Sequence, residues 1–110
     1  HIVTHNGYRI FASQANHSHL GGVALVSKIS TSFLVESPSI INANSIIFEI
    51  NYGSTRCTVA GIYLPPSLDH RVILEDVFNC RDWTKPGNNI ICGDFNARLG
   101  GREQKDMDVD

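Results

Sequence analysis

The residues best suited to chemistry lie in the segment 89–100 of the sequence. A short apolar run at Ile90–Cys92 ends in a glycine and is followed by a carboxylate and a carboxamide, Asp94 and Asn96. Because side chains alternate along an extended chain, these two are expected to share one face, with Phe95 anchored on the other. Ligands of α/β folds usually bind at the carboxyl end of a strand. The alternative is that Asp94 and Asn96 only form a turn with their own backbone.

A second polar side chain is expected at the end of another strand. The apolar run that closes with Tyr63 is followed by Pro65 and Pro66, and proline cannot continue a sheet ladder. Tyr63 therefore lies at a strand terminus. It either packs as an aromatic ring with an exposed hydroxyl or contacts a ligand at the same sheet edge as Asp94.

Residues 44–63 give the clearest local structure, a β-hairpin. Apolar and polar residues alternate on both sides of Gly53 and Ser54, which fit a two-residue loop with glycine first. The resulting register makes one face uniformly apolar and the other a surface of polar side chains. The predicted pairs are Ile50 with Cys57, Phe48 with Val59, and Ile46 with Gly61.

A helix is predicted over residues 70–80, with Asp69 as its N-cap and His70 as a surface residue near its start. Together with the strand before it and the run at 89–92, it forms a strand–helix–strand crossover, and Trp83 is expected to cover one edge. Its apolar stripe consists of Ile73, Leu74, Val77 and Phe78. Further strands are predicted at 8–12, at 21–28 (covered on both faces) and at 32–36, the last broken before Ile40 by Pro38.

Length and composition limit what the chain can be. At 110 residues it has room for one domain at most, and no apolar run approaches the length of a membrane span. A net charge of −2 differs from the basic balance of a protein held to DNA by phosphate contacts alone. Three cysteines without a C-x-x-C pair favour a reducing, intracellular setting.

Two groups of possible metal ligands are not expected to bind an ion. His17 and His19 have no cysteine or carboxylate partner at metal-site spacing, so they are expected to be loop residues. Asp106, Asp108 and Asp110 alternate, but the glycine and the closing glutamate of a calcium loop are missing. Residues 101–110 are therefore expected to form a charged, solvated tail.

Three segments, in the same order, resemble the endonuclease/exonuclease/phosphatase family. Residues 93–96 resemble its GDFN (or GDLN) signature, and their continuation to Gly100 looks most like the endonucleases of non-LTR (LINE-type) retrotransposons. The strand led by Gly21 and Gly22 resembles the GGVA strand of that branch. Residues 63–66 resemble the YxPN or YxPP element, with Pro66 where repair enzymes carry asparagine.

The resemblance implies an α/β fold, as part of a four-layer α/β sandwich (DNase-like), and hydrolysis of phosphodiesters with Mg²⁺. It implies that Asp94 activates water and binds the metal, and that Tyr63 supports the phosphate. Asn96 would donate to the phosphoryl oxygens or help to hold a second ion. The partner implied for the complete protein is DNA, in the nucleus if the protein is a retrotransposon endonuclease.

The family pattern also contains residues that this sequence does not show. A metal-binding glutamate is expected before Tyr8 and an Asp-His pair after Asn96, but residues 1–7 hold no glutamate and the tail holds no histidine. Residues 1–110 are thus expected to be a partial domain, incomplete at both ends, with the facing sheet largely absent and no activity in isolation. Two alternatives stay open: a phosphatase of the inositol polyphosphate type, or a non-catalytic remnant.

Overall fold

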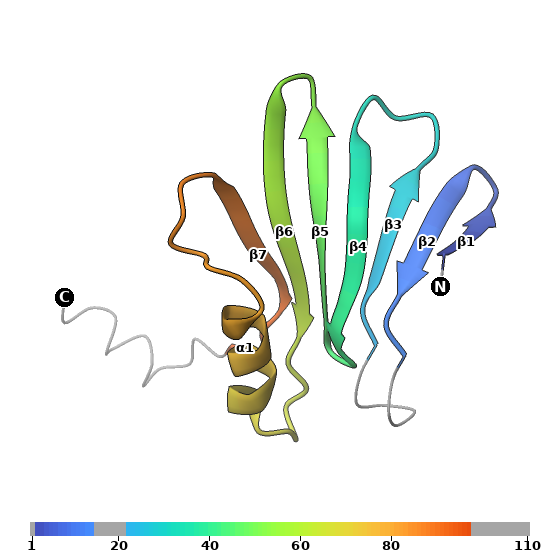
Figure 1. Cartoon of the computed structure of the whole chain (residues 1–110). Coiled ribbons are helices and arrows are strands. Elements are labelled where there is room, and N and C mark those ends of the chain that lie inside the picture. Colours follow the sequence, from blue (N-terminus) through green and yellow to red (C-terminus); the bar gives the residue numbers. More distant parts are fainter. Residues whose placement is uncertain (1, 15–21, 98–110) are drawn as a thin grey trace.

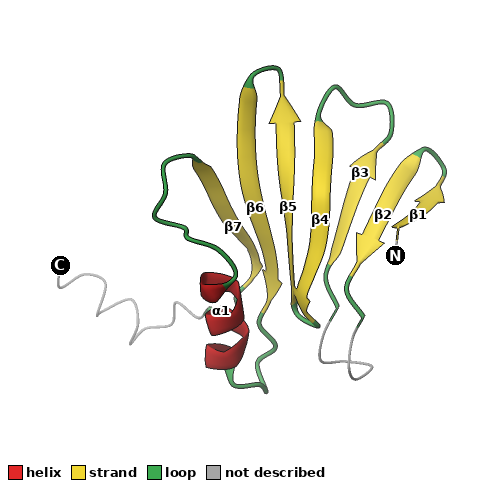
Figure 2. Ribbon diagram, viewed as in Figure 1, coloured by secondary structure: helices red, strands yellow, loops and turns green. Residues whose placement is uncertain are grey.

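The computed structural model describes residues 2–14 and 22–97, which form two β-sheets and one helix (Figures 1 and 2). Sheet A contains three antiparallel strands in the order β1-β2-β3, and sheet B contains four in the order β4-β5-β6-β7. The mixed α/β fold class is therefore confirmed. The elements are β1 (Ile2–His5), β2 (Tyr8–Ala12), β3 (Ala24–Lys28), β4 (Leu34–Asn42), β5 (Ser45–Tyr52), β6 (Thr55–Tyr63), α1 (His70–Asn79) and β7 (Asn88–Asp94).

The hairpin β5–β6 has the predicted register, with Ile50 opposite Cys57 and Phe48 opposite Val59. Gly53 has φ 60°, a conformation that favours glycine in a two-residue loop. The second face of the hairpin differs from the prediction, because Thr58 is buried rather than exposed at a polar surface. That face is covered by α1, so both sides of this hairpin take part in packing.

Sheet A packs on one face of sheet B, with Ile46, Phe48 and Val59 buried between the sheets. Phe11 and Leu25 from sheet A contact this cluster. The expectation that the facing sheet is largely absent was therefore wrong, since three of its strands lie within the described residues. The strand predicted at 21–28 is covered on one face only, because Val26 points away from the core and is exposed.

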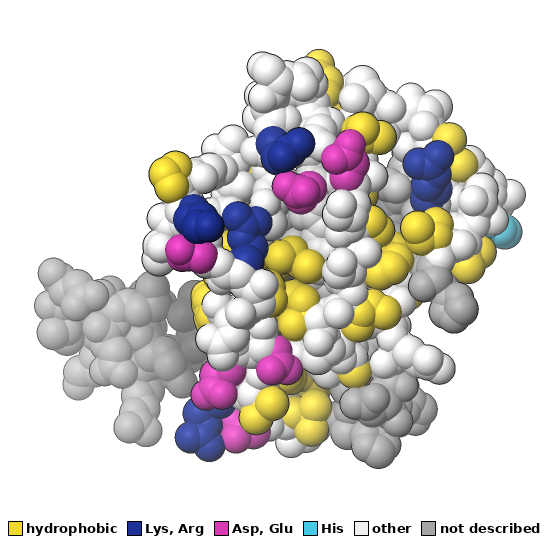
Figure 3. All heavy atoms as spheres, in the orientation of Figure 1, with side chains coloured by type: hydrophobic (Ala, Val, Ile, Leu, Met, Phe, Trp, Pro, Cys, Tyr) yellow, Lys and Arg dark blue, Asp and Glu magenta, His cyan; other side chains and the backbone are white. Residues whose placement is uncertain are grey.

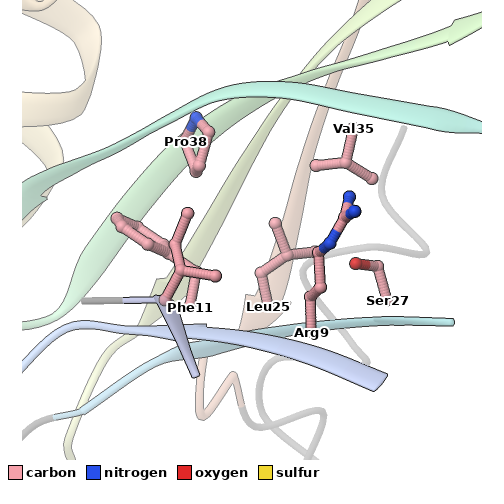
Figure 4. A pocket seen from close by; sticks show the side chains of 7 residues that line it. Arg9, Phe11, Leu25, Ser27, Val35 and Pro38 are labelled. Atoms are coloured by element: carbon pink, nitrogen blue, oxygen red, sulfur yellow. The ribbon is translucent and has the colours of Figure 1, made fainter. Parts of the chain in front are cut away.

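A cavity of about 180 Å³ remains between the two sheets (Figure 4). Side chains from β2 and β3 on one side and from β4 on the other point into it. The lining is mostly apolar, apart from Arg9 and Ser27. The two sheets therefore do not pack closely at this place.

Helix α1 covers the opposite face of sheet B. Asp69 caps it as predicted, accepting a hydrogen bond from the Arg71 backbone N–H at 3.0 Å. Bonds from the Arg71 side chain and backbone lower the pKa of the Asp69 carboxyl. Trp83 donates from Nε1 to the Val77 carbonyl at 2.9 Å and contacts this core. Phe78 was predicted to belong to the apolar stripe, but it is exposed. In the described chain, no helix has the length and apolar character needed to cross a membrane.

Strand β4 continues through Pro38, where the sequence predicted an interruption. Its pairing with β5 shifts between Glu36 and Ser39, and Ser37 has φ 52°. Proline is tolerated here because β4 is the edge strand of sheet B, and the irregularity removes the need for its missing N–H. The pairing then resumes, so both halves of the predicted pattern belong to one strand.

Several predictions fall outside the described residues. These are the loop histidines His17 and His19, the residue Gly21, and the charged tail at 101–110. At the N-terminus, Asn6 and Gly7 form the turn between β1 and β2, with φ angles of 48° and 82°. Strand β1, which precedes this turn and pairs with β2, was not predicted.

The core beside α1 gives a test of the packing. Ile62 is 2 % exposed and lies in the cluster with Ile73 and Val77, whereas Ile90 on β7 is 49 % exposed. We expect Ile62→Ala to lower the free energy of unfolding by about 2–5 kcal/mol, because it leaves a cavity among fixed neighbours. Ile90→Ala serves as the control and should cost under about 1 kcal/mol. Urea denaturation measures the free energy of unfolding of both variants. Equal losses in the two would contradict the packing of α1 on β6.

Candidate functional site

Strands β6 and β7 bring Tyr63 and Asp94 to the same sheet edge. The two strands run parallel, and in their register Tyr63 lies opposite Asp94. The backbone N–H of Leu64 donates to the Asp94 carbonyl at 2.9 Å, which joins the two strand ends directly. The predicted convergence of these two residues at one edge is therefore confirmed.

The Asp94 side chain folds back on the chain that follows it. Its Oδ1 accepts the backbone N–H of Asn96 at 3.0 Å, so the turn-forming alternative is correct for this oxygen. Asp94 is exposed, and its second oxygen has no hydrogen-bond partner among the described residues. One carboxylate oxygen thus holds the turn, while the other makes no hydrogen bond within the described residues.

Asn96 lies near Asp94, but not for the predicted reason. Strand β7 ends at Asp94, and Asn96 has φ 46°, so the alternation of an extended chain does not reach it. Its side-chain amide donates from Nδ2 to the Leu64 carbonyl at 2.7 Å. One amide hydrogen therefore ties the β7 turn to the end of β6, and the second amide hydrogen remains for another acceptor.

Phe95 was predicted to point into the core, and this prediction was wrong. Its side chain is 37 % exposed. The cause is the end of β7 at Asp94, so the alternation of an extended chain does not continue to Phe95. Cys92, on the strand itself, is also exposed, so this end of β7 is covered less than the hairpin beside it.

Gly93 approaches the neighbouring strand closely. It has φ 148°, and a Cβ placed there would overlap the backbone carbonyl of Ile62. Only glycine avoids this overlap, so the residue before Asp94 sets how near β7 comes to β6. The position of the Asp94 carboxylate depends on this contact.

Two residues near Tyr63 were missed by the sequence analysis. Asn44, 6 % exposed, donates from Nδ2 to the Tyr63 carbonyl at 3.1 Å, and its own carbonyl accepts the Tyr63 N–H at 2.8 Å. His70 was predicted to be a surface residue, but it is half-buried with Nε2 2.6 Å from the Pro65 carbonyl. An asparagine at a turn carries no sequence signal for a partner 19 positions away, and a histidine after an N-cap carries none for a carbonyl before the helix.

Asp94 and Asn96 are the residues at this edge whose side chains could hold a metal ion. No group of three or more His, Cys, Asp or Glu side chains gathers within residues 2–14 and 22–97. Carboxylate and amide oxygens such as those of Asp94 and Asn96 suit a Mg²⁺ ion that keeps waters and substrate phosphates as its other ligands. The donor chemistry is therefore suitable, although the set of protein ligands is small.

The described surface carries charges of both signs. In Figure 3, Lys and Arg side chains lie next to Asp and Glu side chains, with apolar atoms between them. Glu49 and Arg56, 3.9 Å apart across the hairpin, form one such pair. The face drawn shows no broad basic area over the described part of the chain, in keeping with the net charge of −2.

Comparison with known proteins gives one informative likeness, to a solved structure. No protein-family model matches the chain, and no curated protein resembles it in sequence. The solved structure described as the "Endonuclease domain of TRAS1, a telomere-specific non-LTR retrotransposon" matches with a TM-score of 0.68 and 19 % identity. The match covers 96 % of this chain and 52 % of that one, so this chain spans about half the length of the neighbour. The two proteins share a fold over this length.

Proposed function

We propose that this chain is the part of a DNA-nicking endonuclease domain that carries the water-activating carboxylate, Asp94. The observation that carries the proposal is the meeting of Tyr63, Asp94 and Asn96 where β6 and β7 end side by side. The likeness of the fold to the TRAS1 endonuclease domain supports it. The three GDFN-, YxPP- and GGVA-like segments identified in the sequence support it independently.

The chemistry follows from which atoms are engaged at this edge. Water must attack phosphorus in line with the P–O ester bond that breaks, while negative charge grows on the phosphoryl oxygens and on the leaving oxygen, which is then protonated from solvent. The second oxygen of Asp94 takes the proton of that water, because the first is held by the Asn96 N–H. The remaining amide hydrogen of Asn96 is available to a phosphoryl oxygen, and the Tyr63 hydroxyl supports the phosphate at the same edge.

The proposal includes a requirement for Mg²⁺. Asp94 would hold the ion, with the side-chain oxygen of Asn96 as a second ligand. When bound, the ion supplies positive charge that offsets the charge developing on phosphate. Since the described residues provide so few ligands, further protein ligands have to come from elsewhere in a working domain.

DNA is the proposed partner of a longer protein that contains such a domain, with the nucleus as its place of action. The mixed charges and the net charge of −2 make tight binding by this chain alone unfavourable. Contact with DNA would then depend on neighbouring parts of the domain, while Asp94 acts at the phosphate to be cut.

The isolated 110-residue chain is expected not to nick DNA. Asp94 provides a single carboxylate at the site, and the glutamate and Asp-His pair of the family pattern are not seen in the sequence. The purified chain would be incubated with supercoiled plasmid and Mg²⁺, and the relaxed form quantified against buffer alone. Nicking that disappears with EDTA and with Asp94→Ala would show that the chain already holds a complete site.

The proposed function itself is tested in a chimaera, where this chain replaces the aligned part of the TRAS1 endonuclease domain. We expect the folded chimaera to nick plasmid DNA with Mg²⁺ and to lose activity with EDTA. Release of phosphate from an inositol polyphosphate without any nicking would favour the phosphatase alternative. A folded chimaera that performs neither reaction, beside an active TRAS1 domain, would favour the non-catalytic remnant.

A further inference from the structure

Three successive backbone carbonyls at the end of β6 each accept a hydrogen bond from a side chain of a different element. These residues, Tyr63, Leu64 and Pro65, are called segment 63–65. The donors are Asn44 at 3.1 Å to Tyr63, Asn96 at 2.7 Å to Leu64, and His70 at 2.6 Å to Pro65. Side chains thus satisfy the carbonyl groups of this segment, so each of the three residues is held in position by its own hydrogen bond.

Asn44 fixes the first residue of the segment from both sides. Its carbonyl accepts the Tyr63 N–H at 2.8 Å while its side chain donates to the Tyr63 carbonyl. Asn44 is buried, and its own N–H donates to Oδ1 of Asn42 at 2.8 Å. The turn between β4 and β5 therefore presents Asn44 to Tyr63 in a fixed orientation.

His70 fixes the last residue of the segment from the start of α1. Because a carbonyl has no hydrogen to give, Nε2 of His70 must carry the proton of the 2.6 Å bond to Pro65. Both the neutral Nε2–H form and the charged form keep this donor. Pro65 has no backbone N–H and cannot donate a ladder hydrogen bond. The hydrogen bond from His70 to its carbonyl therefore holds Pro65 in place.

We propose that Asn44 and His70 are positioning residues, which hold segment 63–65 against the Asp94 turn so that Tyr63 and Asp94 face one substrate. This inference rests on the proposed function for its catalytic consequence, but its structural part stands on the three carbonyl contacts. The link that both residues protect is the bond from the Leu64 N–H to the Asp94 carbonyl, at 2.9 Å.

The structural part is tested on the chain itself by amide hydrogen exchange at Leu64. His70→Leu should speed this exchange about fivefold, the size expected for losing one hydrogen bond, and His70→Gln should restore protection because its amide can donate. Asp69→Ala, which removes the N-cap next to His70, is the control for a weakened helix start. Equal exchange at Leu64 in the parent and in His70→Leu would overturn the proposal, as would an Asp69→Ala effect of the same size.

The role of Asn44 is tested by the same measurement of amide exchange at Leu64. Asn44→Ala should speed exchange at Leu64 in the same direction. If this variant does not fold, the proposal is tested on the parent chain by nitrogen NMR of His70. The neutral ring of His70 must carry its hydrogen on Nε2 to donate to the Pro65 carbonyl. A ring protonated on Nδ1 alone would remove the His70 contact and overturn the proposal.

The catalytic part is tested in the nicking chimaera. His70→Leu should lower kcat about tenfold with little change in KM, and His70→Gln should recover most of the loss, since only the geometry of the reacting groups is altered. If His70→Leu leaves kcat unchanged while Asp94→Asn is inactive, the positioning role is overturned and the proposed function is kept. If Asp94→Asn keeps full activity, the proposed function fails while the exchange result at Leu64 is unaffected.

Discussion

Replacing Asp94 with asparagine is expected to slow DNA nicking by the chimaera about 10²–10⁴-fold, the range typical for losing a general base. DNA binding should hardly change, because the carboxylate acts on charge that develops only in the transition state. Removing a negative charge near phosphate should, if anything, strengthen binding. Single-turnover nicking and a binding titration, performed on the same preparation, separate these two effects.

Asp94→Asn is expected to remove the carboxylate without changing the local structure. The Oδ1 of asparagine can accept the Asn96 N–H as Asp94 does, so the turn after β7 is kept while the proton acceptor is lost. Glu75→Gln is a matched control, because Glu75 is an exposed carboxylate on α1 and should leave nicking unchanged. A rate for Asp94→Asn within a few-fold of the parent would leave Asp94 as a turn-forming residue only.

Local sequence patterns predicted the elements whose pairing is close along the chain. The register of the β5–β6 hairpin followed from alternation around Gly53, and the Asp69 cap followed from the residue before an apolar stripe. The parallel arrangement of β6 and β7 followed from the crossover through α1. Each of these signals acts over a few residues or through one connecting helix, so one sequence was enough to predict them.

Contacts between distant segments were not predictable in the same way. Asn44 bonds to Tyr63 from 19 positions away and Asn96 to Leu64 from 32 positions away, so no local pattern indicates these partners. Phe95 was misplaced because a strand was extended by alternation beyond Asp94, where the backbone in fact turns. The meeting of Tyr63 and Asp94 was predicted because it depends only on where two parallel strands end.

Gly93→Ala is expected to have the largest effect on stability of any substitution at the candidate site. The new methyl group would overlap the carbonyl of Ile62, whose backbone cannot retreat because it is also paired with Ser45 on β5. With φ 148°, the backbone at this position is also unfavourable for a side chain. Together, overpacking and backbone strain should lower the free energy of unfolding by about 2–6 kcal/mol.

Gly87→Ala separates the two causes. Gly87 has φ 145°, close to the 148° of Gly93, but a Cβ there would meet no atom within 4 Å. This control should show the strain alone, about 1–3 kcal/mol in urea denaturation. The excess loss in Gly93→Ala then measures the close approach of β7 to β6, which positions Asp94 beside Tyr63. Equal losses in the two variants would mean that β7 can move away from Ile62, and that the sheet edge does not hold Asp94 in a fixed place.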